Sequence, residues 1–164
     1  MKKYITTLIV FLTINFGGLA IGQVWTGDGV TSNWYTSLNQ APWTPPGWVF
    51  GLAWTTIAIT FSILMTSFYL KNSVKSLKLF FPALLLNIMW NPIFFGLQWV
   101  WTGLVVLVLL SYFIYAIVDS NRKMYGWKYA WLGLPYFIWL IVATSLDMYI
   151  LSLIHISEPT RLGF

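Results

Sequence analysis

Long apolar stretches, separated by short charged or polar segments, dominate the chain. Residues 4–23 carry no charge, and a second continuous apolar stretch covers residues 47–70. A membrane-spanning helix needs about 20 apolar residues, because the hydrocarbon core is about 30 Å thick and a helix rises about 1.5 Å per residue. Each stretch therefore predicts one spanning helix, and Pro45 and Pro46 favour a helix start at the second.

The segment from Leu79 to Val118 is also free of charge, but it is too long for one span. A straight helix over it would be roughly 60 Å long, about twice the thickness of the hydrocarbon core. We predict one turn at Gly96-Leu97-Gln98, with a kink at Pro92 just before it. The pattern thus gives two spans, at residues 79–97 and 101–118.

A last apolar stretch covers residues 128–151 and is interrupted by Pro135 and Asp147. The sequence therefore predicts an all-α membrane protein, a bundle of five transmembrane helices in one domain over residues 1–151. No alternation of the kind found in outer-membrane barrels competes with this prediction.

The two ends of the chain have other interpretations. The first 22 residues also fit a signal peptide, with two lysines, an apolar run and small residues at its end. We interpret them as the first helix, since their removal would leave four spans and break the symmetry of the charge pattern. Residues 152–164 are more polar and contain LSLIHISEPTR, which is similar to translated sequencing-adapter read-through. We treat them as a tail of native or foreign origin and assign no function to His155, Glu158 or Arg161.

The charged residues are too few for a soluble domain. They make up 8% of the chain against 59% hydrophobic residues, whereas a soluble domain has roughly a quarter. This argues against a soluble enzyme and a nucleic-acid-binding protein, although the net charge is +5. In the five-span topology one side of the membrane receives Lys2, Lys3, Lys71, Lys75, Lys78, Arg122, Lys123 and Lys128. The positive-inside rule then predicts a cytoplasmic N-terminus, an outer loop at residues 24–46, and a bacterial inner membrane as the location.

Few residues are suited to catalysis or metal binding. The chain has no Cys, one His and four scattered acidic residues, so we expect no catalytic residue, no metal site and no required cofactor. Aromatic residues make up 20% of the chain and include 11 Trp, more than membrane anchoring needs. We expect Trp25, Trp99, Trp101, Trp127 and Trp131 to be interfacial anchors, and the remainder to indicate a ligand surface.

Aromatic and polar residues gather in three blocks. The first contains Trp34-Tyr35, Pro42-Trp43-Thr44-Pro45-Pro46 and Trp54; the second contains Asn87, Trp90, Asn91 and Phe94-Phe95; the third contains Pro135-Tyr136, Trp139, Ala143 and Asp147. Helical spacing places the second block on one helix face and Trp139, Ala143 and Asp147 on another. Polar residues in mid-membrane face the bundle interior, so two such faces would enclose a cavity for a large, planar, apolar ligand. Hydrogen bonding between helices is the alternative role for Asn87 and Asn91.

These blocks, in this order over about residues 5–151, resemble the translocator protein family, also called tryptophan-rich sensory or peripheral-type benzodiazepine receptor proteins, here a bacterial member. The resemblance implies binding of porphyrins of the protoporphyrin IX type and related apolar ligands, with a role in tetrapyrrole transport, regulation or light-dependent degradation. It also implies the ligand-binding residues: Tyr35 and Trp54 on the lid side, one wall of Asn87, Trp90, Asn91 and Phe94, and Trp139, Ala143 and Asp147 opposite.

Two features depart from the family pattern. Asp147 stands where the family commonly has Asn; protonated, it would donate a hydrogen bond as an amide does, and ionised, it would favour a cationic group. Tyr149 is not followed by Lys or Arg within five residues, so the sterol-recognition segment of animal members is not carried over.

Alternatives from other functional classes remain. A small secondary transporter or exporter is one, although the chain shows no internal repeat and no ionisable relay beyond Asp147. A structural assembly protein is another, in which the aromatic residues only pack. The motifs Gly18-xxx-Gly22 and Gly47-xxx-Gly51 are typical of close helix packing, within one chain or, alternatively, in a homodimer.

Overall fold

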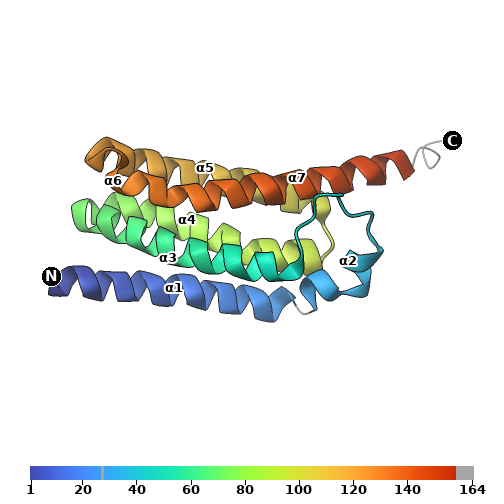
Figure 1. The fold of residues 1–164 in the computed structure, drawn as a ribbon, viewed down its shortest axis with the longest axis horizontal. Coiled ribbons are helices and arrows are strands. Elements are labelled where there is room, and N and C mark those ends of the chain that lie inside the picture. Colours follow the sequence, from blue (N-terminus) through green and yellow to red (C-terminus); the bar gives the residue numbers. More distant parts are fainter. Residues whose placement is uncertain (27, 158–164) are drawn as a thin grey trace.

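The computed structural model describes residues 1–26 and 28–157, and five long helices running side by side form its bundle (Figure 1). These helices are α1 (Lys2–Thr26), α3 (Gly47–Lys71), α4 (Ser73–Asn91), α5 (Val100–Tyr125) and α7 (Leu134–Ser157). Together with the short turns that extend α4 and precede α7, they give five segments long and apolar enough to cross a membrane. The predicted fold class is therefore confirmed, and the described part of the chain contains no strand.

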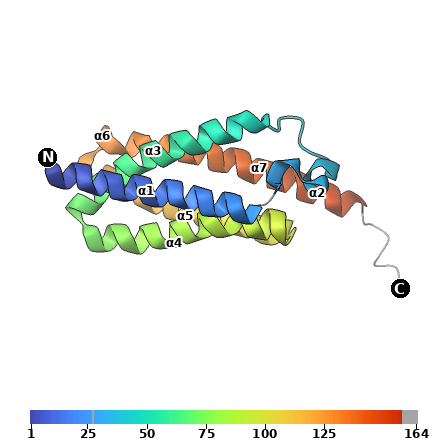
Figure 2. The same ribbon diagram turned by 90° about the horizontal axis from the view of Figure 1, so that it is seen from below.

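Short helical elements occupy the two ends of the bundle. At one end lie η1 (Gly29–Thr31) and α2 (Asn33–Ser37), in the connection between α1 and α3 (Figures 1 and 2). The π-helical turn η2 (Pro92–Gly96) extends α4 at this same end. At the opposite end, near the N-terminus, α6 (Trp127–Ala130) and the 3-10 turn η3 (Trp131–Gly133) lead into α7.

The helices extend beyond the charge-free windows. α4 begins at Ser73, before the expected residue 79, and α5 continues to Tyr125, past residue 118. Lysine and arginine do not end a helix, and at its C-terminus Arg122 and Lys123 interact favourably with the helix dipole. α7 also continues past residue 151 to Ser157, and residues 158–164 of the expected tail lie outside the described residues.

The turn between α4 and α5 lies at the predicted place. α4 ends at Asn91, and Pro92 opens the π-helical turn. The backbone N–H of Leu97 donates to the carbonyl of Pro92 at 2.8 Å, and Gln98 takes a positive φ of 60°. α5 then starts at Val100, so the chain reverses direction within a few residues.

Two packed clusters divide the bundle along its length. The larger cluster includes Leu64, Met65, Phe68, Ile114 and Ile117, all fully buried, toward the end of the bundle at which the N-terminus lies. At the other end a smaller cluster contains Tyr35, Phe94, Val100, Ile150 and Leu151. Members of both clusters line the candidate site, among them Leu107 and Trp139 of the larger cluster and Phe94 of the smaller.

Helix α1 packs closely against α4 at two glycines. A Cβ atom at Gly18 would lie 3.1 Å from Cδ1 of Leu84, and one at Gly22 would lie 2.7 Å from Nδ2 of Asn91. A Cβ atom at Gly22 would therefore force the end of the Asn91 side chain to shift. The Gly18-xxx-Gly22 motif therefore serves packing within the chain.

Candidate functional site

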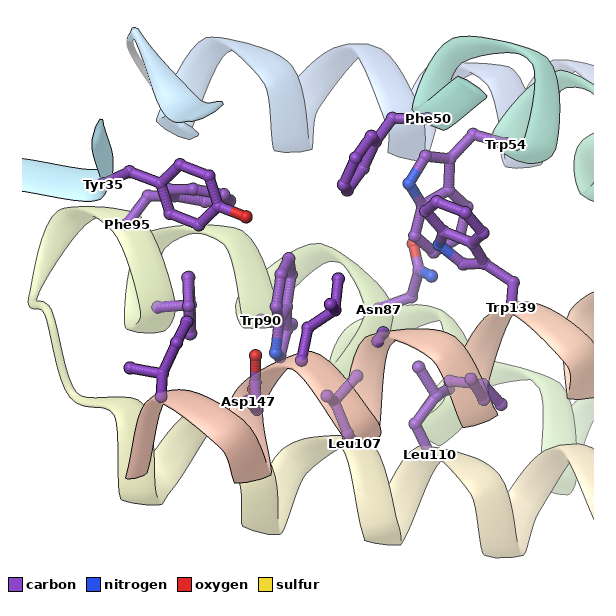
Figure 3. A pocket seen from close by; sticks show the side chains of 15 residues that line it. Tyr35, Phe50, Trp54, Asn87, Trp90, Phe95, Leu107, Leu110, Trp139 and Asp147 are labelled. Carbon is purple, nitrogen blue, oxygen red and sulfur yellow. The ribbon is translucent and has the colours of Figure 1, made fainter. Parts of the chain in front are cut away.

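A cavity opens among α3, α4, α5 and α7, with α2 at its mouth (Figure 3). The space between its atoms is about 590 Å³, which includes open space outside the enclosed part. The lining is predominantly apolar and aromatic: Tyr35, Phe50, Trp54, Asn87, Trp90, Phe94, Phe95, Leu107, Leu110, Trp139, Leu140, Ala143, Leu146, Asp147 and Ile150.

One wall is formed by aromatic rings of α3 and α7. The ring centroids of Trp54 and Trp139 lie 6.2 Å apart in an edge-to-face arrangement, and Phe50 meets Trp139 at 5.0 Å. Tyr136, which does not line the cavity, packs edge-to-face against Trp54 with ring centroids 6.1 Å apart. Aromatic pairs of this geometry are mutually stabilising, so the wall presents fixed indole and phenyl groups to the cavity.

The opposite wall comes from α4 and its π-helical extension. The rings of Trp90 and Phe94 are stacked, with centroids 5.0 Å apart and planes 14° from parallel. One turn earlier, Nδ2 of Asn87 donates a hydrogen bond of 2.7 Å to the hydroxyl oxygen of Tyr136. Asn87 thus lines the cavity and also joins α4 to α7, which combines the two roles left open by its sequence position.

The polar part of the cavity lies where α4, α5 and α7 meet. Asp147 is 2% exposed, and its carboxyl group points toward the indole nitrogen of Trp90 (Figure 3). Apart from each other, neither Nε1 of Trp90 nor Oδ2 of Asp147 has a hydrogen-bond partner among the described residues. Gly103 of α5 lies beside both: a Cβ there would be 3.5 Å from Oδ2 and 3.6 Å from Nε1. A buried carboxyl group with one neutral donor beside it is unusual in an apolar cavity, which makes this pair the chemically distinctive feature of the cavity.

Tyr35 closes the mouth from α2. Its backbone N–H donates to the Ser32 side chain at 3.2 Å, which caps the short helix. The ring packs against Phe94 and Phe95 at 6.3 and 5.5 Å and is 6% exposed. Burial raises the pKa of the Tyr35 hydroxyl, and the nearby Asp147 carboxyl adds to the rise. The phenol is therefore neutral at physiological pH and available as a hydrogen-bonding group at the mouth.

Eight of the nine residues predicted for the site line this cavity. Asn91 does not, because it lies on the edge of the α4 face that packs against Gly22 of α1. Helical spacing identifies one broad face of a helix, but it does not show which neighbouring helix covers each edge of that face.

The sequence interpretation also missed several lining residues, namely Phe50, Phe95, Leu107, Leu110, Leu140, Leu146 and Ile150. Phe50 and Phe95 belong to the aromatic blocks, whereas the leucines and the isoleucine carry no signal that separates them from other core residues.

The tryptophans expected at the membrane interface lie near helix ends and are exposed. Their exposed fractions range from 51% for Trp25 to 64% for Trp127, and the group also contains Trp99, Trp101 and Trp131. None of them lines the cavity. The five expected anchors are thus separate from the three cavity tryptophans Trp54, Trp90 and Trp139, and Trp34, Trp43 and Trp48 belong to neither group.

Comparison with known proteins identifies similar chains. The model of the TspO/MBR family matches residues 8–153. A tryptophan-rich sensory protein of Cereibacter sphaeroides is 35% identical over 115 residues, which is 70% of this chain and 72% of that protein. A tryptophan-rich protein TspO of Archaeoglobus fulgidus is 31% identical over 150 residues, or 88% and 92% of the two chains. The translocator protein of Bos taurus is 31% identical over 139 residues, or 81% and 80%.

Proposed function

Because the chain belongs to the TspO/MBR family, we propose that its cavity binds porphyrins of the protoporphyrin IX type and related planar, apolar molecules. The chain is a multi-pass membrane protein with five candidate spans, so such a ligand would reach it from the bilayer or from either aqueous side. Binding is the function proposed, and no catalytic group is needed for it.

The observation that carries the proposal is the aromatic wall of Phe50, Trp54 and Trp139. Flat rings in fixed orientation offer large contact areas to a planar ligand at low cost in side-chain entropy. The opposite wall adds the stacked rings of Trp90 and Phe94. Few polar groups interrupt these surfaces, as is usual for sites that bind apolar molecules and orient them through a small number of hydrogen bonds.

Tyr35 makes access to the cavity a separate step. Its ring is buried against Phe94 and Phe95 at the mouth, so a ligand much larger than a few water molecules requires α2 to move outward. The connection from Leu38 to Pro46 has few backbone hydrogen bonds and starts α3 at Gly47. We therefore assign α2 and this connection the role of a lid.

The test is quenching of Trp fluorescence by protoporphyrin IX in the purified full-length chain. We expect saturable quenching, and we expect Trp139→Phe and Asn87→Ala to weaken the affinity by about fivefold or more, because each removes a group that faces the ligand. Trp127→Phe is the matched control: this tryptophan is exposed at the far end of the bundle, and its loss should leave the affinity unchanged.

Linear quenching would instead show that the porphyrin partitions into the detergent micelle without binding the protein. Quenching that rises linearly with porphyrin concentration, and equally in all four proteins, would mean that the porphyrin enters the micelle and not the cavity. The proposal would then be wrong, and the transporter and assembly alternatives would take its place.

We also propose an orientation for the chain, with the N-terminus in the cytoplasm of a bacterial cell. Its support is the distribution of basic residues, since the turns between α3 and α4 and between α5 and α6 lie at the same end as the N-terminus (Figure 1). Basic residues at these positions favour retention on the cytoplasmic side.

A further inference from the structure

We propose that Asp147 and Trp90 form a polar subsite in the cavity that selects ligands presenting an N–H group, with amines preferred over carboxylates. The proposal rests on the use of the cavity as a ligand site, but not on the ligand being a porphyrin. Its starting point is the facing pair of Oδ2 of Asp147 and Nε1 of Trp90, which have no further hydrogen-bond partner among the described residues.

The first step concerns what the protein supplies to the carboxyl group. Each carboxyl oxygen can accept about two hydrogen bonds, yet the indole N–H of Trp90 is the single donor that the described residues place beside Oδ2. The neighbouring helix α5 contributes Gly103 at this point, which has no side chain to offer. Unused acceptor capacity in a buried site is costly, so a ligand that brings a second donor gains more here than elsewhere in the cavity.

The second step concerns charge. Among the described residues that line the cavity, Asp147 and Tyr35 are the only ones with titratable side chains, and none is basic. No lysine or arginine therefore competes for the carboxyl group, and the two ion pairs of the described chain involve Asp119 at the far end of α5. A ligand ammonium group would be the sole cation beside Asp147, whereas a ligand carboxylate would place two acidic groups together without a counterion, which is unfavourable.

The third step concerns direction. Asp147 projects from α7 toward α4, and Trp90 projects from α4 toward α7, so both groups meet at one side of an otherwise apolar space (Figure 3). The aromatic wall of Phe50, Trp54 and Trp139 lies across the cavity from this pair. A matching ligand is a flat aromatic body whose N–H group lies at one edge, so that ring stacking and the hydrogen bond are satisfied together.

The test uses two probes with the same aromatic skeleton, 1-pyrenemethylamine and 1-pyrenecarboxylic acid. The full-length protein is placed in nanodiscs of zwitterionic phosphatidylcholine, so that the lipid surface does not favour either charge. Binding is followed by energy transfer from Trp to pyrene. We expect the wild type to bind the amine about tenfold more tightly than the acid, and Asp147→Asn to lower this ratio by at least about fivefold, because an amide cannot give up a proton and form an ion pair with the ammonium group.

Two variants separate a subsite from a general disturbance. Asp119→Asn makes the same acid-to-amide change in an exposed ion pair at the other end of α5 and should keep the wild-type ratio. Trp90→Phe removes the only indole donor that faces Asp147 and leaves an aromatic ring in place. It should weaken both probes equally or increase the preference for the amine, since the ligand then becomes the sole donor to the carboxyl group.

Two outcomes would overturn the proposal. One is an equal amine-to-acid ratio in the wild type and Asp147→Asn; the other is no saturable binding of the amine to the wild type at all. If the amine preference is found but protoporphyrin IX fails to bind, only the porphyrin proposal is wrong. If the porphyrin binds and the ratio does not change, only the subsite is wrong.

Discussion

Asn87 shows how one residue serves packing and ligand contact together. Its Nδ2 donates to Tyr136 at 2.7 Å, and the same side chain borders the cavity. Tyr136 in turn packs against Trp54 and Phe61. The hydrogen bond therefore holds the position of Tyr136, which contacts the cavity residue Trp54. An asparagine in the middle of a spanning helix is thus explained by a partner on a neighbouring helix.

The strength of this hydrogen bond can be measured with a double-mutant cycle of Asn87→Ala and Tyr136→Phe. We expect a coupling free energy of about 0.6 kcal/mol and at most about 1.7 kcal/mol, the average and the maximum found for hydrogen bonds between transmembrane helices. The measurement is the free energy of unfolding in mixed micelles. Tyr115→Phe is the control, since Tyr115 is exposed on α5 and its combination with Asn87→Ala should be additive. Additivity of the Asn87 and Tyr136 variants as well would contradict the assignment.

At the scale of elements, the position of α5 depends on Gly103. A Cβ at this residue would lie 3.2 Å from Cδ2 of Phe94 and close to the Trp90–Asp147 pair. The absence of a side chain lets α5 approach both α4 and α7 at the level of the cavity. A side-chain atom added at Gly103 would press on Phe94 of α4 and on Asp147 of α7, because the surrounding atoms are closely packed.

We therefore expect Gly103→Ala to lower the free energy of unfolding by about 1 kcal/mol through overpacking, and to weaken probe binding in the cavity. Gly17→Ala in α1 is a control of opposite sign, because a Cβ there meets nothing within 4 Å and alanine favours a helix by about 1 kcal/mol over glycine. Thermal unfolding in detergent compares the two. Equal stabilisation by both substitutions would show that α5 has room at Gly103.

The sequence predicts the elements better than the site. Hydrophobic windows identify all five spans, because exclusion of charge from hydrocarbon is a strong constraint on composition. They underestimate α4 and α5, since charged residues continue a helix outside the hydrocarbon layer. At the site, polar and aromatic residues were identified from their unusual positions. Leu107 and Leu110 were not, because a leucine that lines a cavity looks the same in sequence as one that fills a core, and Asn91 was assigned to the cavity although α1 covers it.

At the scale of the whole molecule, charge is distributed unevenly between the two ends. The basic residues near the α3–α4 and α5–α6 turns face a single nearby acid, Asp119, which pairs with Arg122 and Lys123 at 2.9 and 2.6 Å. These pairs are exposed and contribute little to stability. The remaining lysines keep that end positively charged. This charge determines the orientation that the chain takes when it inserts into the membrane, and contributes little to the stability of the inserted protein.

The orientation can be measured directly because the chain contains no cysteine, so one introduced thiol is the sole labelling site. Lys75→Cys at the charged end and Asn39→Cys in the lid both lie at exposed positions. With the N-terminus in the cytoplasm, a membrane-impermeant maleimide should label Asn39→Cys in intact spheroplasts and label Lys75→Cys only after the membrane is permeabilised. Porphyrin binding measured on both purified variants serves as the folding control, since neither residue lines the cavity. The reverse labelling pattern would invert the topology and open the lid to the cytoplasm, and labelling of both sites before permeabilisation would mean that the chain inserts in two orientations despite its charge asymmetry.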